Sequence, residues 1–190
     1  MLTIKYDGAE YSFDAPLTVY DAVAAAGPVS RENIAAKVNG EVVGMTHVIE
    51  ADAEVQLLTF ADADGARVFR HTASHILAQA VKTLYPHAKL TIGPAIDDGF
   101  YYDFDIEPAL TPDDLSGIEA EMKKIVKANH KLERFTLPRE EAIAFMEEKG
   151  EPYKVELIRD LLYNILRNLT YISTVLQITA RNVQRELGAI

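Results

Sequence analysis

Cysteine is absent from the 190-residue sequence, which excludes disulfide bonds and thiolate metal ligands. Long uncharged apolar runs are absent too, and none reaches the roughly 18 residues that indicate a membrane-spanning helix. The first residues alternate in polarity and include acidic side chains early, so we do not expect a signal peptide there. These absences predict a cytoplasmic protein with no membrane partner.

Positive charge is scarce, and its shortage is uneven. The formal net charge is -10, and residues 1–64 hold 11 acidic and 3 basic side chains, whereas the remainder is nearly balanced. Tight binding to nucleic acid needs clustered Lys and Arg, so any contact with RNA has to be local. Hydrophobic residues make up 48% and charged residues 25% of the chain, which is enough for a folded core.

The first 61 residues follow the pattern of a small mixed sheet. Asp7-Gly8 lies between two short alternating segments and predicts a β-hairpin. Thr18 is placed to cap a short helix. Asn39-Gly40 joins two further short strands, and Glu54–Phe60 indicates a stronger one. The order of two strands, a helix and three strands predicts a ubiquitin-like β-grasp domain over residues 1–61.

Residues 62–66 form a small acidic segment with the composition of a linker, which predicts a domain boundary. Residues 67–160 then alternate between helical and strand patterns, which places the whole chain in the α+β class. The expected elements of this second region are a helix over Arg67–Tyr85, strands over 90–96 and 100–105, a helix capped by Thr111, a strand near 132–136 and a helix over Pro138–Lys149.

The last 30 residues, 161–190, have a different character. From Ile158 to Val183, residues at alternating intervals of four and three form a heptad-like, largely apolar series. This spacing predicts an amphipathic helical tail that can self-associate through residues 158–187. A buried strand over Tyr171–Ile178 is the alternative, because β-branched residues are frequent there.

His71 and His75 lie four residues apart on the expected helix and therefore project from the same face. Such a pair can give two nitrogens to one metal ion, with zinc as the candidate, or can hold and deprotonate a water molecule. The same spacing also arises when one histidine is on the surface and the other is satisfied in the core. The Glu of the metalloprotease H-E-x-x-H motif is missing, which disfavours that class.

Several segments around these histidines occur in a specific order: RHTASHILAQAV, YPHAKLTIGPAIDDGFYYDFD, EMKKIVKANHKLERF and EEKGEPYKVELI. This succession resembles the second additional domain, the editing domain, of threonyl-tRNA synthetases, which alanyl-tRNA synthetases share. The earlier segment AAKVNGEVVGMTHVIEADAEVQLLTF resembles the TGS domain that precedes it in threonyl enzymes. The likeness covers residues 1–160 and implies a TGS domain over 1–61 and part of an editing domain over 67–160.

The resemblance implies hydrolytic removal of serine wrongly attached to tRNA(Thr), with contact to the tRNA acceptor end. One methyl group distinguishes the two amino acids and changes binding by only about 1–3 kcal/mol, which is why a second site edits. By match to the family motifs, His71 and His75 handle the water and are the candidate metal ligands. Tyr102 lines the pocket, and Lys154 is its basic group. Without the family, core packing explains Tyr102 and a solvated charge explains Lys154.

The sequence departs from the family after Asp160. The family completes its pocket with a D-x-C-x-G-P-H type motif, and this chain has no cysteine. We also expect the synthetic core to be missing, together with its sites for ATP, magnesium and structural zinc. A truncated or frame-shifted product and a short natural paralogue with an acquired tail are both compatible with this pattern.

Three functions follow from these observations. The first is an editing hydrolase from a threonine–tRNA ligase, with an incomplete pocket and no ligase activity. The second is a non-catalytic TGS-containing module that binds RNA or a protein partner, and the third is assembly through the tail. Hydrolysis that depends on the two histidines indicates the first, and salt-sensitive tRNA binding without them indicates the second. Self-association lost on removal of residues 161–190 indicates the third.

Overall fold

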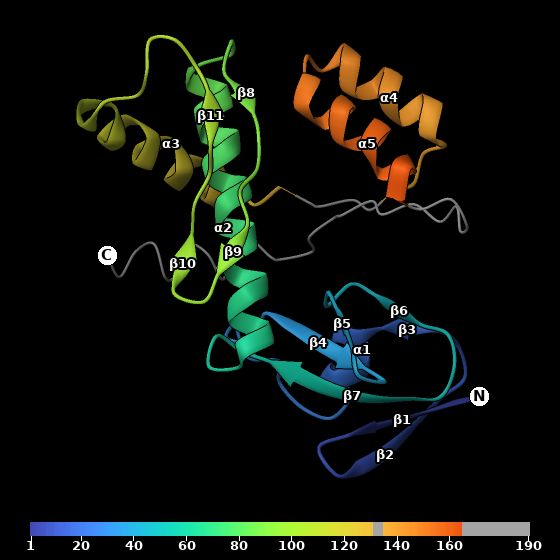
Figure 1. Cartoon of the computed structure of the whole chain (residues 1–190). Helices are drawn as coiled ribbons and strands as arrows, with labels where there is room; N and C mark the ends of the chain where they lie inside the picture. Colours follow the sequence, from blue (N-terminus) through green and yellow to red (C-terminus); the bar gives the residue numbers. More distant parts are fainter. Residues whose placement is uncertain (131–134, 165–190) are drawn as a thin grey trace.

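The computed structural model describes residues 1–130 and 135–164, with side chains through Asp160 (Figure 1). A five-stranded sheet with a short helix comes first, and a region of four longer helices and short strand pairs follows, so the α+β class is confirmed. Of the predicted tail over 161–190, the first four residues are helical in α5 (Pro152–Asn164), and residues 165–190 lie outside the described residues, as does most of the expected strand near 132–136. Within the part that is described, no helix is long and apolar enough to cross a membrane.

The mixed sheet has the strand order β2-β1-β7-β4-β5. Its central pair, β1 and β7, is parallel, and the other neighbours are antiparallel. This is the ubiquitin-like β-grasp that the sequence predicts. Its elements are β1 (Leu2–Tyr6), β2 (Ala9–Phe13), β3 (Leu17–Thr18), α1 (Val19–Ala24), β4 (Ala35–Val38), β5 (Glu41–Val43), β6 (Val48–Ile49) and β7 (Ala53–Leu58).

The predicted turns and cap form this domain as expected. Asp7-Gly8 and Asn39-Gly40 all have positive φ, between 50° and 84°, which suits the tight hairpins that they close. The Thr18 hydroxyl accepts a hydrogen bond from the Asp21 backbone N–H at 3.1 Å and so caps α1. Helix and sheet enclose an apolar core that includes Leu2, Ile4, Val19, Val23, Ile49 and Val55.

The long helix α2 spans Ala63–Leu84 and begins four residues earlier than the sequence predicts. Residues 63–66, expected to be linker, therefore form its first turn, and Gly65 and Ala66 are buried. The small residues of this segment give it the composition of a linker. In the structure, the same small size allows the first turn of α2 to approach the sheet closely. The apolar core also continues across this point, because Phe69 of α2 packs in one cluster with Ile34 and Leu58 of the first region.

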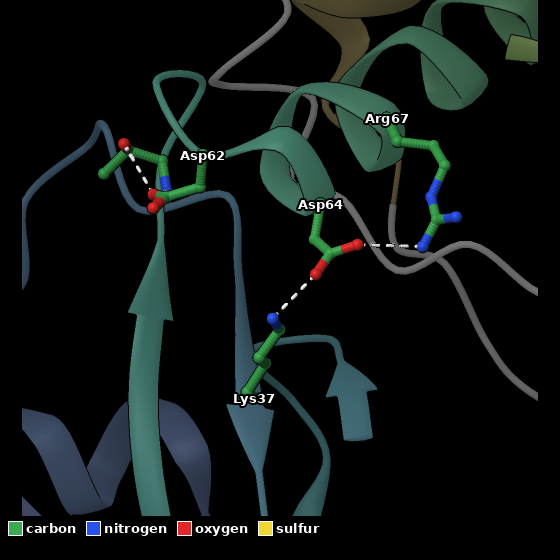
Figure 2. Close-up of polar contacts among 5 residues, drawn as sticks. Lys37, Asp62, Asp64 and Arg67 are labelled. Atoms are coloured by element: carbon green, nitrogen blue, oxygen red, sulfur yellow. Dashed lines mark hydrogen bonds and ion pairs between the residues drawn. The ribbon is translucent and has the colours of Figure 1, made fainter. Parts of the chain in front are cut away.

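Polar contacts fix the start of α2 (Figure 2). The Asp62 carboxylate turns back to accept hydrogen bonds from the Thr59 backbone N–H at 2.7 Å and from its hydroxyl at 3.0 Å. These bonds lower the pKa of Asp62. Asp64 pairs with Lys37 of β4 at 2.7 Å and with Arg67 at 2.9 Å, so the first helical turn is tied to the sheet.

Three further helices follow α2: the first packs against α2, and the other two form a pair on the other side of it (Figure 1). The short 3-10 turn η1 (Pro112–Asp114) leads into α3 (Leu115–Ala128), which packs along α2 around Val81 and Ile118. The predicted cap is present: the Asp114 carboxylate accepts hydrogen bonds from the Thr111 N–H and hydroxyl. The remaining helices are α4 (Arg139–Glu148) and α5 (Pro152–Asn164), which pack on each other.

The two strands predicted over 90–96 and 100–105 are interrupted. Each is split into two short strands, which pair as β8 with β11 and as β9 with β10. Their bounds are β8 (Lys89–Leu90), β9 (Ala95–Ile96), β10 (Gly99–Phe100) and β11 (Phe104–Asp105). In the first strand the interruption has a physical reason: Pro94 has no backbone N–H to donate to a sheet, and side chains from α2 and α5 bind the backbone carbonyls of Thr91 and Gly93.

Candidate functional site

His71 and His75 lie on successive turns of α2 and contact each other. Their Nε2 atoms are 3.3 Å apart, and the two rings are perpendicular, at 89°, with centroids 4.7 Å apart. His71 is half-buried and His75 is exposed. For this contact to be a hydrogen bond, one ring has to donate from its Nε2–H and the other has to accept with its lone pair.

The environment keeps both histidines neutral. Burial lowers the pKa of His71. The pKa of His75 falls to about 4, first through loss of solvation by neighbouring protein atoms, and then through repulsion from His71 when that ring is protonated and from the positive charge of Lys154. Because His75 retains an exposed edge, solvent can reach a ring that is unprotonated at neutral pH. A neutral imidazole can accept a proton or a hydrogen bond from water.

We expect the depressed His75 pKa to reduce stability on acidification. The folded-state pKa of about 4 lies below the ordinary value of 6.5, so the unfolded chain binds the proton first. The free energy of unfolding should therefore fall between pH 6.5 and pH 4, as measured by urea denaturation. His75→Gln should show a shallower fall in this window. An identical pH dependence of wild type and variant would contradict the assignment.

A backbone segment, Thr91–Gly93, connects the histidine helix with α5. The Ser74 hydroxyl lies between the His71 carbonyl, at 2.7 Å, and the Gly93 carbonyl, at 3.0 Å. On the other side, Lys154 Nζ donates to the Thr91 carbonyl at 3.0 Å. Ser74 is completely buried, so this link holds the segment against the same helix turn that carries the histidines.

Tyr102 packs against this segment. A Cβ added at Gly93 would lie 2.0 Å from the Tyr102 ring, so only glycine allows the ring to approach so closely. The other side of Tyr102 stacks on Phe104, with centroids 4.9 Å apart and an angle of 18°. Burial, and to a smaller extent the charge of Glu151, raises the pKa of Tyr102. Its hydroxyl therefore stays protonated and can donate a hydrogen bond.

Lys154 is half-buried in the first turns of α5. Burial lowers the pKa of its ammonium group, and the nearby carboxylate of Glu151 opposes that change. Of the four residues that the sequence indicates, Tyr102 and Lys154 contact the Thr91–Gly93 segment directly, whereas the helix turn of His71 and His75 is joined to it through Ser74. His71 and His75 come from α2, Tyr102 from the connection between β10 and β11, and Lys154 from α5.

Zinc fits this arrangement only in part. Two nitrogens bound to one tetrahedral zinc ion are about 3.3 Å apart, which matches the spacing of the two Nε2 atoms. Structural and catalytic zinc sites have three or four protein ligands, however, and the described residues contain no cluster of three or more His, Cys, Asp or Glu suited to a metal. We therefore derive no chemical step through a metal ion.

Four residues of this site are not found by sequence reasoning: Ser74, Thr91, Gly93 and Glu151. Two of them act through backbone carbonyls, which carry no side-chain signal. Ser74 lies between the histidines in the HTASH segment, and its position three residues after His71 is the one available clue. Glu151 begins the EPYKVELI segment, where a charge at a helix start is ordinarily solvated.

The first region is a ubiquitin-like β-grasp, and residues 6–59 match the family model described as the TGS domain. The chain therefore begins with a TGS domain, followed by a helical region that carries the His71–Lys154 site.

Comparison with curated proteins extends the likeness beyond the TGS domain. The chain is 56% identical over 161 residues to a threonine--tRNA ligase of Acetivibrio thermocellus, which covers 84% of the chain and 25% of that enzyme. The corresponding ligase of Clostridioides difficile is 54% identical over 156 residues, covering 82% of the chain and 24% of the enzyme. The chain matches the amino-terminal region of these ligases and spans about a quarter of their length.

Proposed function

We propose that this chain is an editing module that binds the acceptor end of tRNA(Thr) and hydrolyses wrongly attached serine. The observation that supports this function best is that one backbone segment, Thr91–Gly93, contacts the Tyr102 ring and Lys154 and is bonded through Ser74 to the helix turn of the two neutral histidines. Those groups are suited to ester hydrolysis, which needs a proton acceptor for water and a stabilised oxyanion. Such a function places the protein in the cytoplasm, with the translation machinery.

Each side chain has a role that its surroundings allow. A neutral His71 or His75 binds the attacking water through Nε2 and accepts its proton as the water adds to the ester carbonyl. Lys154, held at the Thr91 carbonyl, can turn a remaining N–H toward the oxyanion that develops on that carbonyl. The Tyr102 hydroxyl donates a hydrogen bond to the ribose or accepts one from the seryl ammonium group.

The direct test is single-turnover hydrolysis of tRNA(Thr) carrying either serine or threonine by the purified 190-residue chain. We expect serine to be released well above the spontaneous rate, and threonine to be released more slowly. The preference for serine should be about 10-fold or more, in keeping with a difference of one methyl group.

Two results would contradict the proposal. If neither amino acid is released above the spontaneous rate, the chain has no hydrolytic function. If both are released equally fast, the chain does not select serine and the editing function is contradicted. Salt-sensitive tRNA binding without hydrolysis would instead support a non-catalytic RNA-binding module. Self-association that requires residues 161–190 would support assembly through the tail, and light scattering at several concentrations measures it.

A further inference from the structure

Ser74 lies between the two histidines of α2 and is completely buried. Its hydroxyl is 2.7 Å from the His71 carbonyl oxygen and 3.0 Å from the Gly93 carbonyl oxygen. A hydroxyl has one proton, which it donates to one of the two carbonyls or shares between them. The His71 carbonyl already accepts the regular bond of the helix from the N–H four residues later. Among the described residues, the Ser74 hydroxyl is the donor available to the Gly93 carbonyl.

Other hydroxyls on α2 behave differently. The Thr72 and Thr83 hydroxyls donate to carbonyls four residues earlier in the same helix, at 3.2 and 2.8 Å. Such back-bonding is an ordinary way to satisfy a hydroxyl inside a helix, and it needs no second element. The Ser74 hydroxyl also reaches a carbonyl that is 19 residues away in the sequence. Ser74 is therefore a link between two elements and not only part of its own helix.

Three successive backbone carbonyls, those of Thr91, Ile92 and Gly93, accept hydrogen bonds from three different parts of the site. The donors, in the same order and each at 3.0 Å, are Lys154 Nζ, the Asp103 N–H and the Ser74 hydroxyl. The first donor belongs to α5, the second follows Tyr102 in the chain, and the third belongs to the histidine turn of α2. This segment is thus a common support for the site, and Ser74 joins it to the histidines.

Gly93 passes this constraint on to Tyr102. A Cβ added at Gly93 would lie 2.0 Å from a carbon of the Tyr102 ring, so the ring rests directly on the glycine backbone. Arg70 of α2 also bonds to this hairpin, but at the Asp97 carbonyl in the turn between β9 and β10. The bond from Ser74 is the one that acts where the Tyr102 ring is supported.

We propose that Ser74 is a positioning residue of the editing site: its buried hydroxyl holds the Gly93 carbonyl at the histidine turn and so sets the distance between the histidine pair and Tyr102. This role rests on the proposed editing function. Ser74 does not touch the reacting atoms, because it is completely buried. It acts through Gly93 on the place of the Tyr102 ring.

Ser74→Ala tests this role, because it removes the hydroxyl, adds no atoms and favours the helix. The matched control is Thr72→Val. Thr72 also lies between the histidines in the sequence and is also buried, but its hydroxyl bonds within α2. Ser74→Cys keeps a weaker donor and should give effects between those of serine and alanine. It replaces Ser74→Ala if that variant does not fold, as judged by urea denaturation.

NMR of the Gly93 carbonyl provides a readout that does not depend on activity. The sequence contains two Gly-Pro pairs, Gly27-Pro28 and Gly93-Pro94, so labelling of glycine carbonyls with ¹³C and of proline with ¹⁵N selects these two carbonyls. We expect Ser74→Ala to shift the Gly93 carbonyl resonance and the Tyr102 ring resonances, the latter assigned with Tyr102→Phe. Gly27 should be unaffected, and Thr72→Val should leave all of these resonances in place.

Single-turnover hydrolysis of seryl-tRNA(Thr) at increasing concentrations of the chain provides the second readout. Ser74→Ala should lower the rate at saturation about tenfold or more, because small misplacements of reacting groups have effects of this size. The concentration that gives half of the maximal rate should stay unchanged, and Thr72→Val should keep the wild-type rate. Unchanged Gly93 or Tyr102 resonances in folded Ser74→Ala would overturn the proposal, and so would a wild-type rate at saturation.

The two readouts separate the two proposals. Shifted Gly93 and Tyr102 resonances in Ser74→Ala, with no hydrolysis by the wild type, would support the positioning role of Ser74 and contradict the editing function. Hydrolysis by the wild type that proceeds equally fast in folded Ser74→Ala would support editing and contradict the role of Ser74.

Discussion

Gly65→Ala is expected to destabilise the chain by about 2 kcal/mol, although alanine is the better helix former. A Cβ at position 65 would lie 2.0 Å from the Thr59 carbonyl oxygen and 2.8 Å from its carbonyl carbon. Both are backbone atoms of the residue that follows the central strand β7, so no side-chain rotation relieves the clash. The first turn of α2 would have to move away from the sheet, and the contacts of Lys37 with Asp64 would be strained.

Gly117→Ala is the matched control for this prediction. Gly117 lies inside α3, is exposed, and has no atom within 4 Å of an added Cβ. Its replacement should stabilise the chain by up to about 1 kcal/mol, because alanine loses less conformational entropy in a helix. Urea denaturation of wild type and both variants measures the difference. If Gly65→Ala also stabilises the chain, the prediction is wrong, because α2 would then not lie so close to the Thr59 backbone.

The TGS domain is largely predictable from the sequence because local signals agree there. Asp7-Gly8 and Asn39-Gly40 demand positive φ, Thr18 supplies a cap, and the alternating strands have one apolar face. The start of α2 is not predictable in this way. Ala63–Ala66 has the composition of a linker. Its helical state is supported by the ion pair of Asp64 with Lys37 of β4, a residue distant in the sequence, and by close packing of Gly65 on Thr59, and composition reveals neither contact.

The strands around the candidate site show the same limitation. Residues 90–96 have an apolar pattern that predicts a continuous strand. Gly93-Pro94 is a local sign of a break, because proline has no backbone N–H. The sequence does not show that Ser74 and Lys154, 19 and 63 residues away, bind the carbonyls on either side of Ile92. Sequence reasoning is strong where a structure depends on neighbours in the chain, and weak where side chains bind distant backbone groups.

Among the residues of the candidate site, too, only those with a local signal are predictable from the sequence. The spacing of His71 and His75 predicts their contact, since residues four apart on a helix share a face. Only the family resemblance points to Tyr102 and Lys154, because neither carries a local signal that distinguishes it from core packing or a surface charge. Glu151 carries no signal in the sequence, because it is an ordinary acid at a helix start and only the fold buries it next to Lys82.

Replacement of both histidines is the second change with a large expected effect. His71→Ala/His75→Ala removes the two neutral rings that can bind water and accept its proton, while Tyr102 and Lys154 keep their contacts with Thr91–Gly93. General base catalysis contributes about 100-fold to 10,000-fold to a rate, so the loss should reach at least 100-fold. His87→Ala is the control, because His87 is exposed and bonds to the Glu107 carbonyl, outside the site.

The most direct measurement is the single-turnover rate of serine release from seryl-tRNA(Thr) by wild type, His71→Ala/His75→Ala and His87→Ala, each checked for folding by urea denaturation. We expect release by the wild type and His87→Ala at similar rates, and release at the spontaneous rate by the folded double variant. Equal rates in the wild type and the folded double variant would contradict the account, because the histidine pair would then take no part in hydrolysis.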